Sequence, residues 1–273
     1  MLIRYLLVVI VASLWTTMAA ADDLSGKLTV QANGREQGIF EKSAVKFEKQ
    51  NPKIRTRVVE PEGGDALAAV GDGTVDVAVV GSNLPPEEKA LISTVVGWEG
   101  IAVMVNASNR VAEVNLGQLA DIFSGKVKTW DELGGLDSRI SVIQREEGKG
   151  LRPYLEQLLK LDGNLVKGKG VIEPDKEAVK AVAGTLNAVS YVDLNVGVNN
   201  VSVGVPIRLL AINRLEPEPA NVSSGAYPLR RPILLVTKNP PSPVAKAFID
   251  FMLGKDGQKA VQEEEFVPLL VTK

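Results

Sequence analysis

QREEGKGLR, residues 144–152, stands between an apolar run at 140–143 and an amphipathic run that begins at Leu151. This order predicts a strand, a glycine turn and a helix. The first N–H groups of a helix have no partner inside it and carry the positive end of the helix dipole, so such a turn can receive an anion. Arg145 and Lys149 would add formal positive charge. The spacing leaves open the alternative of an ordinary strand-to-helix turn with two solvated cations.

Three earlier strands are predicted to end in the same kind of loop. The runs at 27–32, 54–59 and 75–80 have the apolar content of strands, and a glycine-bearing or polar loop follows each one. In open α/β sheets, ligands lie at the carboxyl ends of the strands. Although many strand-to-helix loops have this composition, these three are candidate ligand-binding loops. Their candidate residues are Gly34, Arg35 and Glu36 in the first, Gly63, Gly64 and Asp65 in the second, and Ser82 and Asn83 in the third.

Strands and helices alternate along the rest of the chain, which predicts an α/β fold. The glycine turns fall into two groups, 34–83 and 145–152, and we therefore expect two lobes. Lobe I is expected to hold residues 22–105 and 208–273, and lobe II residues 106–207. The further predicted strands are 101–105, 188–192, 201–207 and 232–237, and the further predicted helices are 115–123, which Asn115 and Gln118 can cap, 175–184 and 244–251.

Residues 1–21 have the composition of a secretory signal peptide. Arg4 is the only charge, 6–14 is an apolar run, and the three alanines at 19–21 form a small-residue cleavage site. The apolar run is too short for a good membrane span. We expect cleavage after the last of these alanines and a soluble mature protein in the periplasm.

The composition excludes several classes of protein. The 273 residues carry a net charge of −2, which argues against a nucleic-acid-binding protein of the basic-patch kind. The chain has no Cys, so a large core rather than disulfides must stabilise it, and no lipid-anchoring Cys follows the signal segment. It has no His, which removes histidine-based acid–base catalysis, the Ser-His-Asp triad and most zinc sites. We therefore expect neither an enzyme nor a metal or cofactor site.

Four segments resemble motifs of one protein family. They are DVAVVGSN at 76–83 with PPEE at 85–88, LADIFSGKVKTW at 119–130, REEGKGLR at 145–152, and YPLRR at 227–231. They occur in the family's order along the chain, and LADIFSGKVKTW is the most specific. On these segments the mature chain resembles the phosphate-type periplasmic substrate-binding proteins of ABC transporters, within the type II periplasmic-binding fold.

The resemblance implies two α/β lobes that close on an oxyanion in a cleft between them. The implied ligand-binding loops are the three named above together with the arginine–glycine turn. Arg145 is expected to be the main cationic contact, at a strand end where its removal would leave the fold intact. The resemblance also implies a small anionic, phosphate-like ligand, a membrane permease of an ABC transporter as partner, and a monomer. In the turn, the implied ligand-binding residues are Arg145, Gly148, Lys149, Gly150 and Leu151.

The chain departs from the family at positions that would touch the ligand. Phosphate binders of the family have Asp where Asn83 aligns, and that carboxylate accepts the proton of phosphate and repels fully ionised sulfate. The Ser and Thr of the family's glycine turn are Lys149 and Leu151 here, and Arg35 with Glu36 replaces a hydroxyl in the first turn. We expect weaker selection of phosphate over sulfate. The alternative left open is a binding-fold protein that has lost uptake and acts in sensing, scaffolding or adhesion.

Overall fold

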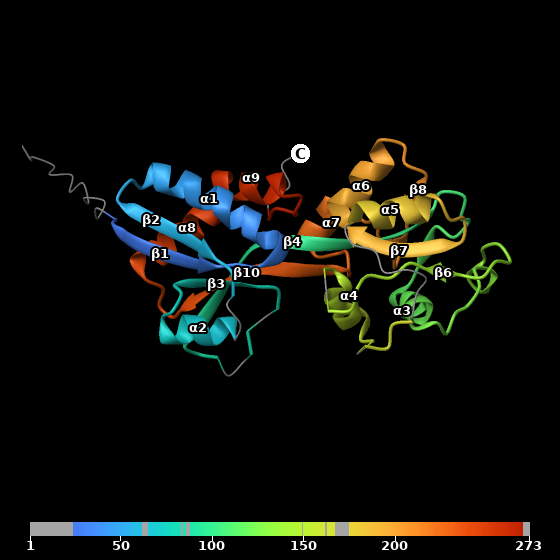
Figure 1. The fold of residues 1–273 in the computed structure, drawn as a ribbon, viewed down its shortest axis with the longest axis horizontal. Coiled ribbons are helices and arrows are strands. Elements are labelled where there is room, and N and C mark those ends of the chain that lie inside the picture. Colours follow the sequence, from blue (N-terminus) through green and yellow to red (C-terminus); the bar gives the residue numbers. More distant parts are fainter. Residues whose placement is uncertain are drawn as a thin grey trace, which may run out of the picture.

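The computed structural model describes residues 24–61, 65–82, 84–85, 88–148, 150–161, 163–166 and 175–269. Within these ranges the chain is a mixed α/β protein (Figure 1). The strands are β1 (Gly26–Gln31), β2 (Ile54–Val59), β3 (Val77–Val80), β4 (Leu91–Asn106), β5 (Glu113–Val114), β6 (Ser141–Val142), β7 (Ala188–Asp193), β8 (Ile207–Leu209), β9 (Ala211–Ile212) and β10 (Arg230–Lys238). The helices are α1 (Gln37–Gln50), α2 (Ala66–Asp72), α3 (Leu116–Ser124), α4 (Arg152–Leu159), α5 (Asp175–Ala183), α6 (Leu194–Ser202), α7 (Pro219–Ser224), α8 (Pro243–Leu253) and α9 (Lys255–Glu263), with 3-10 turns η1 (Gly34–Glu36) and η2 (Asp131–Leu133). Of the helices described, none combines the length and the apolar content that crossing a bilayer requires.

One path of strands runs through both halves of the molecule. Its order is β2-β1-β3-β10-β4-β7-β6, with β8 paired to the end of β4. β1 is parallel to β2 and β3, whereas β10 is antiparallel to β3 and β4. The long strand β4 changes partner along its length, because 91–100 pairs with β10 and 101–106 with β7 and β8. Figure 1 shows β4 crossing between two lobes, so the predicted two-lobed α/β fold is confirmed.

The exact lobe boundaries, expected at 105 and 207, stay predictions, and the strand pairing favours different positions. β4 changes partner between Gly100 and Ile101. After β8 the chain still packs on lobe II, because Leu210 and Leu229 lie in the same buried cluster as the side chains of α3, α4 and β7. We propose that the chain crosses into lobe II at 100/101 and returns to lobe I at 229/230.

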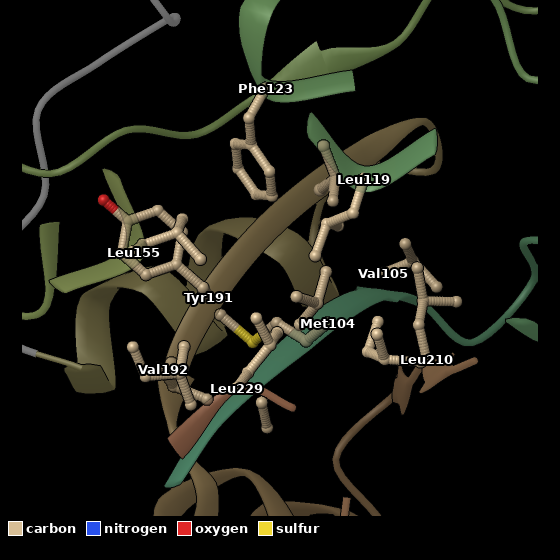
Figure 2. Packing of buried hydrophobic residues seen from close by; sticks show 14 of the residues in the cluster. Met104, Val105, Leu119, Phe123, Leu155, Tyr191, Val192, Leu210 and Leu229 are labelled. Carbon is tan, nitrogen blue, oxygen red and sulfur yellow. The ribbon is translucent and has the colours of Figure 1, made fainter. Parts of the chain in front are cut away.

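Figure 2 shows the core of lobe II, where side chains from β4, β7, α3 and α4 meet. The rings of Phe123 and Tyr191 pack edge to face, with their centroids 5.6 Å apart. Leu119 and Leu155 are fully buried in the same cluster. Burying one such side chain contributes about 1.5–3 kcal/mol, so α3 and α4 are held firmly on the sheet. The glycine turn that leads into α4 is therefore anchored at its helical end.

The core of lobe I joins α1 and α8 to the parallel strands. Phe40 and Phe47 of α1 are buried, as is Phe248 of α8. The rings of Phe47 and Phe248 pack edge to face at 5.2 Å. Phe40 lies in the first turn of α1, so its burial fixes the start of that helix, and η1 lies between β1 and α1.

Local sequence signals set the starts of α3 and α6. The capping box of α3 is confirmed, because Gln118 N donates to Asn115 Oδ1 and Asn115 N donates to Gln118 Oε1. At α6, the side chain of Asp193 accepts hydrogen bonds from the N–H groups of Asn195 and Val196. Such caps stabilise a helix start by about 0.5–2 kcal/mol.

One predicted strand is wrong. The valines at 201–207 favour a strand, but α6 extends to Ser202 and β8 begins only at Ile207. The aspartate cap and the packing of α6 against β4 and β8 overrule the β-propensity of the valines. The correction matters for function, because the capping residue, Asp193, belongs to the candidate site.

Candidate functional site

Three arginines and four carboxylates meet where the lobes join. Buried charges are tolerated only when they are paired, and here each arginine has at least one carboxylate partner. Three positive and four negative groups give a formal charge of −1 when all are ionised. This charged network consists of Arg35 and Glu36 in η1, Glu99 in β4, Arg145 after β6, Asp175 in α5, Asp193 at the end of β7, and Arg231 in β10.

Arg35 connects the two lobes. It follows Gly34, whose φ of +55° lies in the left-handed region and turns the chain out of β1. Arg35 Nη1 lies 3.3 Å from Glu99 Oε1 and 3.3 Å from Asp193 Oδ2. Its guanidinium carbon lies 5.1 Å from the ring centroid of Phe266. The Arg35 side chain is 36% exposed, whereas both carboxylates are 1% exposed, so a ligand can reach the guanidinium from solvent.

Arg231 lies deeper, between β3, η1 and α4. Its Nη2 lies 2.5 Å from Glu36 Oε1, and its Nε pairs with Glu99 Oε2. The guanidinium carbon lies 3.7 Å from the ring centroid of Tyr154, which comes from α4 of lobe II. A Cβ added to Gly81 at the end of β3 would collide with the guanidinium, so only glycine leaves room for this arrangement. Arg231 therefore joins the glycine loop after β3 to the opposite lobe.

Arg145 is buried, which excludes the alternative of a solvated cation at the strand end. It is 2% exposed and pairs with Asp175. Its Nη2 donates to the Tyr191 carbonyl at 3.2 Å, and its guanidinium lies 5.5 Å from the Tyr191 ring centroid. Arg152 Nη1 in turn donates to the Arg145 carbonyl at 2.9 Å. The burial of this pair favours the opposite of the expected outcome for removal of Arg145, a cost to the fold, because removal would leave Asp175 without this partner.

Burial is the main influence on protonation in the network. It raises the pKa of the Asp193 carboxyl to about 7, and the negative charges of Glu99 and Asp175 add to the rise. Arg35 acts in the opposite direction and lowers the same pKa. Burial also raises the pKa of Glu99, although Arg231 and Arg35 oppose that rise. Asp193 is thus poised to exchange a proton near neutral pH.

The network is continuous across the two lobes. Asp193 N donates to Asp175 Oδ2 at 3.3 Å, which ties the Arg35 end to the Arg145 end. Guanidinium forks match the geometry of carboxylate and of other oxyanions. The arrangement can therefore bind an oxyanion wherever such a ligand replaces one of the chain's own carboxylates.

The remaining candidate residues divide into four groups. The Leu151 side chain is 3% exposed and packs in the core of lobe II, so only its backbone could contact a ligand. Asp65 caps α2, where its Oδ1 accepts a hydrogen bond from Leu67 N at 2.9 Å. Ser82 is exposed beside Gly81. Gly148 and Gly150 are exposed with φ of +73° and +56°, and Gly63, Gly64, Asn83 and Lys149 lie outside the described residues.

Three of the four carboxylates, Glu99, Asp175 and Asp193, were not among the site residues predicted from the sequence. A charged residue within or directly after an apolar strand was the available signal, since such residues are seldom buried unless paired. Glu99 interrupts the apolar run of β4, and Asp193 ends the buried strand β7. Nothing in the local pattern marks Asp175 or Tyr154. Among the described residues, no cluster of acidic side chains has an arrangement that could hold a metal ion.

Comparisons with known proteins agree on one family. The profile of the PBP superfamily domain matches residues 17–256. The phosphate-binding protein PstS of Bacillus subtilis (strain 168) is 30% identical over 253 residues, which cover 90% of this chain and 81% of that protein. The phosphate-binding protein PstS of Borreliella burgdorferi is 24% identical over 207 residues, or 70% of this chain and 71% of that protein.

Solved structures share the fold. An ABC-type phosphate transport receptor from Vibrio cholerae superposes with a TM-score of 0.79 at 22% identity, over 89% of this chain and 99% of that one. PstS from Borrelia burgdorferi superposes with a TM-score of 0.81 at 19% identity, over 90% of this chain and 100% of that one. At these identities the structures establish the shared two-lobed architecture.

Proposed function

The chain belongs to the PBP superfamily, among the phosphate-type substrate-binding proteins of ABC transporters, and from this membership we propose that it binds a small oxyanion between its lobes for uptake. Phosphate is the proposed ligand, because the relatives that cover most of the chain are phosphate-binding proteins. The relatives are transport proteins, and we assign no catalytic step to the chain. The proposed site residues are those of the four loops together with Arg231.

The single observation that carries the proposal is the meeting of three guanidinium groups at the lobe junction. Arg35 comes from lobe I and Arg145 from lobe II, and Arg231 contacts Tyr154 across the junction. A carboxylate is itself an oxyanion, so the observed pairs have the geometry that a phosphate oxygen would adopt. Binding would therefore exchange one or more internal carboxylates for ligand oxygens.

The cellular setting follows from the same membership. We infer that residues 1–21 direct export and are removed, that the mature protein is periplasmic and monomeric, and that a membrane permease receives the ligand. The substitution of Asn83 for the family's aspartate supports weaker discrimination against sulfate.

The formal charge of the network favours a second candidate function. Because four carboxylates accompany three arginines, an added dianion would make the junction more negative unless protons are taken up. A binding-fold protein that senses, scaffolds or adheres through its lobes would need no such ligand. This alternative predicts that the charged network stays closed in solution at any phosphate concentration.

Calorimetric titration of the mature chain with phosphate and with sulfate tests the proposal. We expect one phosphate site, and Arg35→Gln should weaken it about tenfold or more, because a charge-assisted contact is lost. Arg110→Gln, which changes an exposed arginine on the loop after β4, should bind like wild type. Absence of heat with both anions would reject anion uptake and favour the alternative.

A further inference from the structure

Asp193 pairs with Arg35, whose guanidinium is the one that a ligand can reach most easily. Arg35 is the one member of the network's three arginines with substantial exposure, 36% against 3% and 8% for the side chains of Arg145 and Arg231. Its Nη1 atom is shared between Asp193 Oδ2 and Glu99 Oε1, both at 3.3 Å. A ligand oxygen that accepts a hydrogen bond from this Nη1 must therefore compete with a carboxylate that is already paired with it.

The two competing carboxylates are held differently. Glu99 is bound by two arginines, since Arg231 Nε pairs with its other oxygen. Asp193 has Arg35 as its only ion-pair partner among the described residues, and its second oxygen accepts hydrogen bonds from Asn195 N and Val196 N. Backbone caps of this kind are retained by a neutral side chain, so Asp193 can lose its charge without losing its place at the start of α6.

We propose that Asp193 determines the specificity of the site by holding Arg35 when ionised and releasing it when protonated, so that binding of an oxyanion is coupled to the uptake of one proton. The inference rests on the proposed function, because it assumes that an oxyanion enters between the lobes. It assigns to Asp193 a role as a positioning residue that acts through Arg35.

The groups that face Asp193 support this coupling. From η1 comes the positive charge of Arg35, from β4 the negative charge of Glu99, and from α5 the negative charge of Asp175. Burial and these two carboxylates favour the protonated form, and the pKa of about 7 places the change near neutral pH. An arriving anion adds negative charge beside Asp193 and raises its proton affinity further.

The consequence concerns the ligand. Each anion that binds together with a proton leaves the junction with less added negative charge than the anion alone would bring. The site can thus accept a highly charged oxyanion although the family's proton-accepting aspartate is replaced by Asn83. In this chain Asp193 carries the proton, so the ligand need not be protonated.

The test compares affinity for inorganic phosphate in wild type, Asp193→Asn and Asp250→Asn. Asn keeps the cap of α6 and imitates the protonated carboxyl, while Asp250 is an exposed carboxylate of α8 that pairs with Lys246 far from the junction. The ionisation of phosphate itself is common to all three proteins and cancels in the ratio of dissociation constants. The ratio of wild type to Asp193→Asn should be near 1 at about pH 5.5 and rise to about 30 at about pH 8.5, while the ratio to Asp250→Asn stays near 1 throughout.

A second variant keeps the proposal falsifiable if Asp193→Asn fails to fold. Arg35→Gln should lose most affinity at about pH 5.5, where Arg35 is released to the ligand, and least at about pH 8.5, where Asp193 holds it in the wild type. Loss that is equal at both pH values overturns the proposal, as does a flat ratio for Asp193→Asn. If the wild type binds phosphate but these ratios are flat, the proton coupling alone is wrong. If the wild type binds no phosphate, the proposed function fails with it.

Discussion

Replacing Arg145 by alanine should destabilise the fold, contrary to the expectation from sequence. Arg145 is 2% exposed, and its guanidinium pairs with Asp175 and donates to the Tyr191 carbonyl. Removing one member of a buried ion pair costs about 3–5 kcal/mol, because the other charge stays buried without it. The Asp175 side chain is 18% exposed, so solvent screens part of this penalty and we expect a loss of about 2–4 kcal/mol.

The loss should be visible in thermal unfolding of the mature protein. For a chain of this length, 1 kcal/mol shifts the melting temperature by about 2–4 °C, which predicts a decrease of about 5–15 °C. Arg145→Lys should recover part of it, since a point charge reaches Asp175 without the second donor to Tyr191. Arg110→Ala, at an exposed arginine, should stay within about 0.5 kcal/mol of wild type. Equal melting temperatures for Arg145→Ala and wild type would refute the buried-pair reasoning.

Three further variants test other parts of the structure. The free energy of unfolding of Asp193→Asn, relative to wild type, should rise by up to about 4 kcal/mol between about pH 4 and about pH 7. Burial raises the pKa of the Asp193 carboxyl from 3.8 to about 7, so over this range the unfolded wild type loses a proton that the folded wild type keeps, and only the wild type is destabilised. Urea unfolding at both pH values would show a constant difference if the carboxyl is ionised throughout. Gly81→Ala should weaken phosphate binding about tenfold while the protein remains folded, since the added Cβ would displace the Arg231 guanidinium. Calorimetry would measure the affinity, with circular dichroism as the folding control, and an unchanged affinity would mean that the contact does not matter for binding. Leu155→Ala should lower the free energy of unfolding by about 2–5 kcal/mol, because its side chain is fully buried in the core of lobe II, and a loss below about 1 kcal/mol in urea unfolding would mean that α4 is not anchored there.

Local features of the fold could be predicted from the sequence. The strand, glycine turn and helix around 144–152 depend on neighbouring residues, and so does the capping box of Asn115 and Gln118. The helix α6 was missed because its valines resemble a strand, although Asp193 stands at the capping position. Propensity is a weak signal when a cap and tertiary packing oppose it.

Only part of the candidate site could be predicted from the sequence, because its paired residues lie far apart along the chain. Arg35, Glu36 and Arg145 stand out because they lie in glycine turns. Their partners do not, since Glu36 meets Arg231 across 195 positions and Arg35 meets Glu99 across 64. Such pairs follow from the order of strands in the sheet, which places β10 beside β4, and no local pattern specifies that order.

The proposed function requires that an oxyanion binds among Arg35, Arg145 and Arg231. Crystals of the mature protein grown with arsenate, a phosphate analogue, allow anomalous scattering to locate the anion directly. We expect one strong anomalous peak between the lobes, within hydrogen-bond distance of the Arg35 guanidinium, with Asp193 no longer in contact with that group. A peak elsewhere on the surface, or none while Arg35 remains on Asp193 and Glu99, would contradict it.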